Sequence, residues 1–410
     1  MIKFLKRGFA VLSGNLSISI SNFIISGILI SKNGLKSYGL FVVLQSCYLI
    51  WMTVSKPVTW QTIVKFAPSL DLKILVKESI KIEIISALAS TTLIITTLAI
   101  AKQYNTWISD YLLVALVILC GSLITNNGTL LGYLRASGNF STVANIQIAS
   151  AILKVLTSLK LSHDIQLYFI TTVLIDIVLW GIAVAHTIHK HKPLITEKPN
   201  HNYSFSSLLK FSYWGTFHAV LDLPVTQLDK ILISSLIGLE ATGVLDIIKK
   251  LSQVVGQFAA PIYQVIFPEY TKLLYEHKTT KLLKLSANLS ILILACGIAV
   301  VTCTYLTFNL INSYAFSDEL YGYKRELILY LSIQSLALCF IWVHPLSISL
   351  GKMKQTAYIL IASNTLYLGT IYLFAKQYSI DAVIFAFTLQ SSTLIAAKLY
   401  IILNSLRTKT

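Results

Sequence analysis

Three ionisable side chains recur on one face of a helix predicted over residues 211–237, inside an otherwise apolar stretch. His218, Asp222 and Asp229 are separated by four and then seven residues, the spacing of a single helical face. An ionisable group in an apolar span is costly unless it is paired or hydrated, so these side chains are predicted to face a hydrated cavity. Asp222 lies beside Pro224 and one turn from His218, and its carboxylate is the best candidate for a switch that binds and releases a proton or a cation.

A matching polar face is predicted for the helix over 11–31. Its members recur at steps of four, three and four residues, and they are Asn15, Ser19, Asn22 and Ser26. A shift of 203 residues places Asn15 on His218 and Ser26 on Asp229. The two stripes are therefore interpreted as the same face of one repeated helix.

A third polar face, on the helix predicted over 241–266, carries lysines and amides. Its candidate binding residues are Lys249, Lys250, Gln253 and Gln257, with Asp246 on the same helix. Lysine ammonium groups bind phosphate as point charges, and amides hydrogen-bond to hydroxyl groups. The alternative is that these polar groups only join helices together, which is the usual role of an isolated Ser, Asn or Gln in a membrane protein.

The elements that position these faces are predicted from the composition. Of the 410 residues, 55% are hydrophobic and 12% are charged, whereas soluble domains carry about 25% charged residues. A helix that spans a bilayer needs roughly 20 apolar residues. Twelve such runs are present: 11–31, 38–55, 79–101, 111–134, 142–160, 165–188, 211–237, 241–266, 286–310, 327–349, 356–375 and 381–404. The chain is predicted to be all-α, a polytopic membrane protein of about 12 transmembrane helices.

The twelve runs form an internal repeat. An offset of 204 residues places Gly39 of "KSYGLF" on Gly243 of "EATGVL". Six helices per copy leave both copies in the same orientation, so this is a parallel repeat of the kind found in transporters. We predict an N-terminal six-helix lobe over 1–192, a cytoplasmic linker over 193–207 and a C-terminal six-helix lobe over 208–410, with the candidate site between the lobes.

The net charge of +16 is distributed by loop. Of the 33 Lys and Arg residues, twenty fall in alternate loops and termini, and seven fall in the intervening loops. This is the positive-inside pattern, and it predicts that both termini are cytoplasmic. No nucleic-acid partner is needed to explain the charge. The five cysteines have no metal-binding or disulfide spacing, and no catalytic constellation is found, so neither an enzyme activity, a cofactor nor a metal is expected.

The segment "QLDKILISSLIGLEATGVLDIIKK" at 227–250 resembles the region after the midpoint of the polysaccharide (O-antigen) flippases in the multidrug/oligosaccharidyl-lipid/polysaccharide exporter superfamily. In that family an Asp-Lys or Asp-Arg pair precedes an aliphatic run, and a Gly in the next turn begins a helix. "SYGLFVVLQS" and "LLGYLRASGNF" in the first half are similar to the corresponding family segments, but Val244 stands where the family often has an aromatic residue.

The resemblance implies that the protein translocates a polyprenyl-pyrophosphate-linked oligosaccharide across the bacterial cytoplasmic (inner) membrane, by alternating access, for cell-surface polysaccharide or O-antigen biosynthesis. Its expected partners are that lipid-linked oligosaccharide, membrane lipids, and polysaccharide polymerase and assembly machinery. Two other functions stay open. One is a cation-coupled multidrug antiporter of the same fold, which would also use intramembrane acids such as Asp222 and Asp229. The other is a membrane glycosyltransferase or polysaccharide polymerase. It is disfavoured because such enzymes need a structured extramembrane loop for catalysis, and the longest non-cytoplasmic loop of this chain, around 311–326, is too short.

Overall fold

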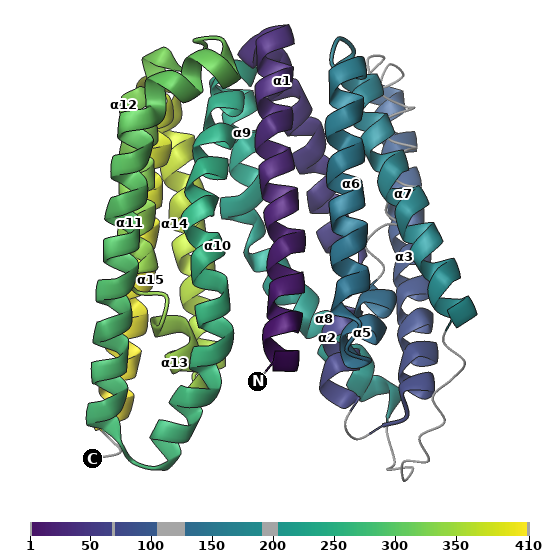
Figure 1. Cartoon of the computed structure of the whole chain (residues 1–410), viewed down its shortest axis with the longest axis vertical. Coiled ribbons are helices and arrows are strands. Elements are labelled where there is room, and N and C mark those ends of the chain that lie inside the picture. The colour runs from purple at the N-terminus through teal and green to yellow at the C-terminus, as the bar shows by residue number, and fades with distance from the viewer. Residues whose placement is uncertain (1, 68–69, 105–127, 191–203, 408–410) are drawn as a thin grey trace. The chain divides into compact units, whose positions relative to one another are not determined.

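The computed structural model describes residues 2–67, 70–104, 128–190 and 204–407, and within them it contains helices and no strand (Figure 1). The chain divides into two compact units. Unit 1 consists of Met1–Ile25 and Leu44–Leu223, and unit 2 of Ser26–Val43 and Pro224–Thr410. The predicted linker over 193–207 falls mostly outside the described residues, so the lobe boundaries at 192 and 208 stay a prediction.

Unit 1 is built on the two outer parts of the long helix α1 (Ile2–Ser55) and on six further described helices. These are α2 (Thr59–Phe66), α3 (Leu72–Tyr104), α5 (Gly128–Ala136), α6 (Phe140–Leu161), α7 (Ile165–Lys190) and α8 (Phe205–Leu221). The helix α6 packs along α7, and α2 packs against α5. An apolar core that includes Ile63, Leu75 and Leu208 joins α2, α3 and α8. The predicted run 111–134 lies largely outside the described residues.

Unit 2 contains the middle part of α1 and the remaining helices. They are η2 (Pro224–Leu228), α9 (Asp229–Leu236), α10 (Leu239–Tyr275), α11 (Thr279–Phe316), η3 (Tyr321–Tyr323), α12 (Lys324–Leu338), α13 (Val343–Ser349), α14 (Met353–Tyr378) and α15 (Ile380–Arg407). The most extensive contacts within unit 2 are those of α14 with α15 and of α11 with α12, and α10 contacts α9, α11, α12 and α13. The first turns of α10 are therefore enclosed, and residues 241–249 are all buried.

The helix predicted over 211–237 is interrupted, which corrects the expected continuous polar stripe. The helix α8 ends at Leu221, a π-helical turn covers Pro224–Leu228, and α9 begins at Asp229. Proline cannot donate a backbone hydrogen bond and so disturbs a helix interior, and a π turn holds more residues than an α turn. His218 and Asp222 therefore do not continue along one α-helical face to Asp229.

Two glycines allow the middle part of α1 to approach α10 closely. A methyl group on Gly39 would lie 1.8 Å from the carbonyl oxygen of Leu239, and one on Gly243 would lie 2.8 Å from the carbonyl oxygen of Leu35. The offset of 204 residues that relates Gly39 to Gly243 also relates Leu35 to Leu239. The contact is thus reciprocal, as expected when two copies of a repeat pack against each other. Between the predicted runs 11–31 and 38–55, α1 bends at Gly34, where φ is 76°.

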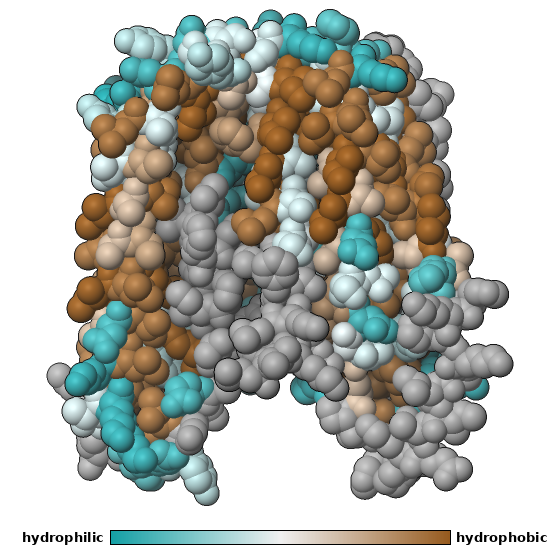
Figure 2. All heavy atoms as spheres, in the orientation of Figure 1, coloured by the Kyte–Doolittle hydropathy of each residue, from teal (hydrophilic) through white to brown (hydrophobic). Residues whose placement is uncertain are grey.

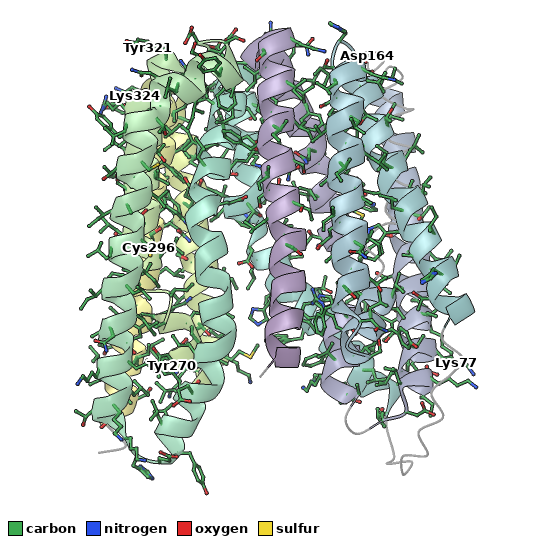
Figure 3. The ribbon with its side chains drawn as sticks, viewed as in Figure 1. Lys77, Asp164, Tyr270, Cys296, Tyr321 and Lys324 are labelled. Atoms are coloured by element: carbon green, nitrogen blue, oxygen red, sulfur yellow. The ribbon has the colours of Figure 1, made fainter. Side chains whose placement is uncertain are left out.

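Seven described helices are long enough and apolar enough to cross a membrane. Hydrophobic side chains cover the middle of α11, with hydrophilic side chains near its ends (Figure 2), and Ile291, Ile298 and Leu306 are exposed there. Loops assigned to opposite membrane sides lie at opposite ends of each unit. In unit 1, Lys77 and Asp164 mark the two ends, and in unit 2 Tyr270 lies toward the end opposite Lys324 (Figure 3). The chain is a multi-pass membrane protein.

Candidate functional site

A cluster of five charged groups, three of them buried and two partly buried, lies inside unit 2, and its centre is the carboxylate of Asp229. Asp229 is fully buried at the start of α9. Its Oδ2 forms an ion pair with Lys249 of α10 and accepts a hydrogen bond from the Tyr367 hydroxyl of α14 at 2.6 Å. Its Oδ1 accepts a hydrogen bond from the Lys230 backbone N–H at 2.8 Å. The helices α9, α10 and α14 thus converge on one carboxylate.

The second carboxylate of the cluster is Asp246, one turn before Lys249 and Lys250 on α10. Its Oδ1 accepts a hydrogen bond from the Lys230 ammonium group at 2.7 Å, and its Oδ2 lies 2.9 Å from the Lys250 ammonium group. The Tyr38 hydroxyl donates to the same Oδ2. Lys250 also donates to the Tyr38 hydroxyl at 2.7 Å and to Ser26 Oγ at 2.8 Å. The middle part of α1 therefore supplies the uncharged ligands of Lys250.

The charges in this cluster do not balance. Lys230, Lys249 and Lys250 meet two carboxylates, so one positive charge is left over among these five groups. Burying charge in a low-dielectric interior costs several kcal/mol per ion even when the ion is paired. Ionisable groups inside membrane helices are consequently functional candidates by default. The side chains of Lys230 and Lys250 keep 12% and 16% exposure, while Lys249 keeps 8%.

A separate cavity of about 510 Å³ lies inside unit 1. This volume is within the range of pockets that hold small molecules. Its lining combines aromatic, amide, hydroxyl and charged side chains. They include Asn22, Lys56, Trp60, Glu83, Gln147, Ser150, Lys154, Asp176 and Trp180. The two lysines are matched by two acids, so the charged residues of this cavity are balanced.

The acids of the cavity are held in fixed positions. Asp176 of α7 pairs with Lys154 of α6 at 2.7 Å and accepts a hydrogen bond from Ser150 at 2.7 Å. Glu83 of α3 accepts hydrogen bonds from the Thr59 hydroxyl and the Thr129 backbone N–H. Lys56 lies just beyond the candidate span Ser13–Ser55. Burial lowers the pKa of Lys56 to about 8, and the Glu83 carboxylate opposes part of this shift.

The structure brings four of the predicted binding residues into the cluster of unit 2, namely Ser26, Asp229, Lys249 and Lys250. Asn22 instead lines the cavity of unit 1, and Asn15 and Ser19 are half-buried on α1.

The remaining predicted residues lie on α8 and α10. His218 is half-buried, with its ring against Trp214 and Phe217, and Asp222 is exposed at the end of α8. Gln253 is exposed, and Gln257 is not among the residues whose side chains the structure describes.

Sequence reasoning did not include Tyr38 and Tyr367 among the site residues. Tyr38 lies 208 positions from Asp246, and Tyr367 lies 138 positions from Asp229. No spacing along one helix can indicate such partners, although the repeat that pairs Gly39 with Gly243 could have pointed to the segment around Tyr38. Lys56 and Glu83 were also missed, because neither belongs to a polar stripe. Among the described residues, no group of three or more His, Cys, Asp and Glu side chains could hold a metal ion.

Residues 82–312 match a protein-family model described as "Polysaccharide biosynthesis protein". This match covers more than half of the 410 residues and confirms the predicted resemblance. A search of curated protein sequences found no match.

Solved structures of multidrug transporters share the fold over nearly the whole chain. The inward-facing form of a multidrug resistance MATE family transporter of the MOP superfamily matches with a TM-score of 0.72 at 13% identity, covering 98% of both chains. The outward-facing form of a multidrug resistance MATE family transporter of the MOP superfamily matches with a TM-score of 0.65 at 15% identity, covering 100% of this chain and 97% of the other. The Vibrio cholerae MATE transporter VcmN in the bent form gives a TM-score of 0.58 at 14% identity, covering 99% and 97%. The predicted fold class is therefore confirmed.

Proposed function

Since the chain belongs to the polysaccharide biosynthesis protein family, we propose that it moves a polyprenyl-pyrophosphate-linked oligosaccharide from the cytoplasmic to the outer leaflet of the bacterial inner membrane. The transported oligosaccharide would supply cell-surface polysaccharide such as O-antigen. The polymerase and assembly machinery that use it outside would be its functional partners.

The physical problem of this transport is the polar part of the substrate. Sugar hydroxyl groups and a pyrophosphate cannot cross about 30 Å of hydrocarbon unaided, because each loses its hydration. The prenyl chain can remain in the lipid. A protein that solves the problem needs cationic groups for the pyrophosphate and hydrogen-bonding groups for the sugars, both within apolar helices.

The observation that carries the proposal is the excess positive charge of the cluster in unit 2. Lys230 and Lys250 share one carboxylate, Asp246, and both keep some exposure. A pyrophosphate that approaches them can bind both lysines while Asp246 stays their shared partner, and the left-over positive charge favours this added anion. Lys249 is more deeply buried and is engaged by Asp229, so the phosphate role is assigned to Lys250 with Lys230.

The cavity of unit 1 offers a complementary environment. Its charged residues are balanced, so it does not select a strongly anionic group. Asn22, Gln147 and Ser150 supply amide and hydroxyl partners, and Trp60 and Trp180 supply flat apolar surfaces. Sugar rings present hydroxyl groups at their edges and C–H groups on their faces, which fits this combination.

A cation-coupled multidrug antiporter is the second candidate. Multidrug MATE transporters share the fold. In this chain, Glu83 and Asp176 place two carboxylates beside aromatic side chains in the cavity of unit 1, and such a lining also suits an organic cation.

Deletion of the gene tests the two functions in one strain. Lipid-linked oligosaccharide should accumulate on the cytoplasmic face and surface polysaccharide should be lost, while sensitivity to a cationic dye stays unchanged. In the deletion strain, the double variant Lys250→Gln with Lys230→Gln should not restore the surface polysaccharide, although the variant protein is present at the wild-type level. Lys160→Gln is the matched control, because Lys160 is exposed in the last turn of α6 and belongs to none of the ion pairs among the described residues. Increased dye sensitivity with normal polysaccharide would support the antiporter instead.

A further inference from the structure

The ammonium group of Lys249 lies in an unusual place for a lysine in a membrane helix. It donates a hydrogen bond to the Val225 carbonyl oxygen at 2.6 Å and forms an ion pair with Asp229. The carboxylate oxygen that it contacts also accepts the Tyr367 hydroxyl. Lys249 and Asp229 are both buried, at 6% and 0% exposure.

Two oxygen atoms contact this ammonium group, one from a carboxylate and one from a backbone carbonyl, and a phenol hydroxyl is hydrogen-bonded to the same carboxylate oxygen. Oxygen ligands of this kind are those that hard cations prefer. The carbonyl belongs to Val225, inside the π-helical turn that interrupts the predicted run 211–237. Carbonyl groups of broken membrane helices are a recurrent source of ligands for monovalent cations in transporters.

The rest of the cluster leaves Asp229 dependent on Lys249 for its charge balance. The ammonium groups of Lys230 and Lys250 both contact Asp246. Lys230 reaches Asp229 only through its backbone N–H. Without Lys249, Asp229 would be a fully buried carboxylate with no lysine ammonium partner among these residues, and such a group must take up a proton or a cation.

We propose that Lys249 is a tethered cation, whose ammonium group occupies a buried oxygen-lined site, formed by Asp229, the Val225 carbonyl and Tyr367, that would otherwise bind a monovalent metal ion such as Na⁺. The wild-type protein therefore does not bind Na⁺ at Asp229. Shortening Lys249 opens the site to the ion. The proposal concerns the unit 2 cluster alone and holds whichever substrate is transported.

Thermal unfolding of the purified full-length protein in detergent tests this. The Tm is measured in NaCl, LiCl, KCl and choline chloride at constant ionic strength. The wild type should have the same Tm in NaCl and in choline chloride. Lys249→Ala should unfold earlier in choline chloride and recover by a few degrees in NaCl, with a rise that saturates with Na⁺ concentration, as expected for a ligand that binds only the folded state.

Two variants serve as controls. Lys250→Ala removes the neighbouring lysine but leaves Asp246 paired with Lys230, so its Tm should not respond specifically to Na⁺. The double variant Lys249→Ala with Asp229→Asn removes the carboxylate and should lose the response of the single variant. If Lys249→Ala does not survive purification, limited proteolysis of membranes washed in NaCl or in choline chloride gives the same comparison.

Two results would overturn the proposal. One is a Lys249→Ala protein whose Tm is no higher in any alkali chloride than in choline chloride. The pair of Lys249 with Asp229 would then be a structural contact only. The other is a saturable Na⁺ response of the wild type that Asp229→Asn abolishes, because the ion would then bind beside the lysine.

Discussion

At the scale of single residues, the structure separates two aspartates that the sequence treats alike. Asp229 is fully buried and paired with Lys249, whereas Asp222 is exposed at the end of α8. Removing one member of a buried ion pair costs about 3–5 kcal/mol, because the other charge is left without compensation. Asp229→Asn should therefore lower the Tm of the detergent-purified protein by several degrees, and Asp222→Asn should leave it nearly unchanged. Equal losses in the two variants would contradict the assignment of Asp229 as the centre of the cluster.

Helical spacing predicted Ser26, Asp229, Lys249 and Lys250 as binding residues, since membership of a polar face depends only on positions along one helix. It could not predict that Lys230 and Lys250 share Asp246, because that pairing depends on how α9 packs on α10. It also favoured Asp222 as the switch, since residue type and a nearby proline do not reveal burial. The cavity-lining role of His218 and Asp222 stays a prediction.

At the scale of elements, the reciprocal glycines are the most specific packing feature. A methyl group on Gly39 would overlap the Leu239 carbonyl of α10, a backbone atom that cannot rotate away. Overpacking of this kind costs about 1–3 kcal/mol. Gly39→Ala and Gly243→Ala should each lower the Tm. Gly369→Ala on α14, where a methyl group meets nothing within 4 Å, should be neutral or slightly stabilising, because alanine favours helix. A Gly39→Ala protein as stable as the wild type would show that this contact is not tight.

Most predicted runs coincide with observed helices, because a stretch of about 20 apolar residues has few other solutions in a bilayer. The run 142–160 lies within α6 and 381–404 lies within α15. The predicted run 211–237 contains a break, and 327–349 contains a second one between α12 and α13. Hydropathy averages over such breaks, and Pro224 marks only the first.

At the scale of the whole molecule, the distribution of Lys and Arg among the loops predicts how the protein is oriented in the membrane. In a variant with its natural cysteines replaced by serine, Lys77→Cys and Lys281→Cys should be protected from an impermeant thiol reagent in intact cells. Asp164→Cys and Asp318→Cys should be labelled. The positive-inside pattern places the first pair on the cytoplasmic side. Labelling of the first pair with protection of the second would reverse the orientation, and with it the direction of transport.

The fold of the whole chain could be predicted because composition, repeat and loop charge agree with one another. The substrate could not, since polar stripes indicate that something hydrophilic is bound without identifying it. The family match favours a role in polysaccharide biosynthesis, and the excess positive charge around Asp246 favours an anionic group. These two independent observations support the proposed pyrophosphate-linked oligosaccharide as substrate.

Reconstitution tests the central claim most directly. The purified protein is placed in liposomes with prenyl-pyrophosphate-linked oligosaccharide extracted from the host cells, and membrane-impermeant periodate then oxidises the sugars of the outer leaflet. Liposomes with the wild-type protein should expose nearly the whole pool over time. In empty liposomes, and in liposomes with the double variant Lys250→Gln and Lys230→Gln, periodate should oxidise only the oligosaccharide that starts in the outer leaflet. Oxidation limited to the outer leaflet in liposomes that contain folded wild-type protein would contradict the proposed flipping.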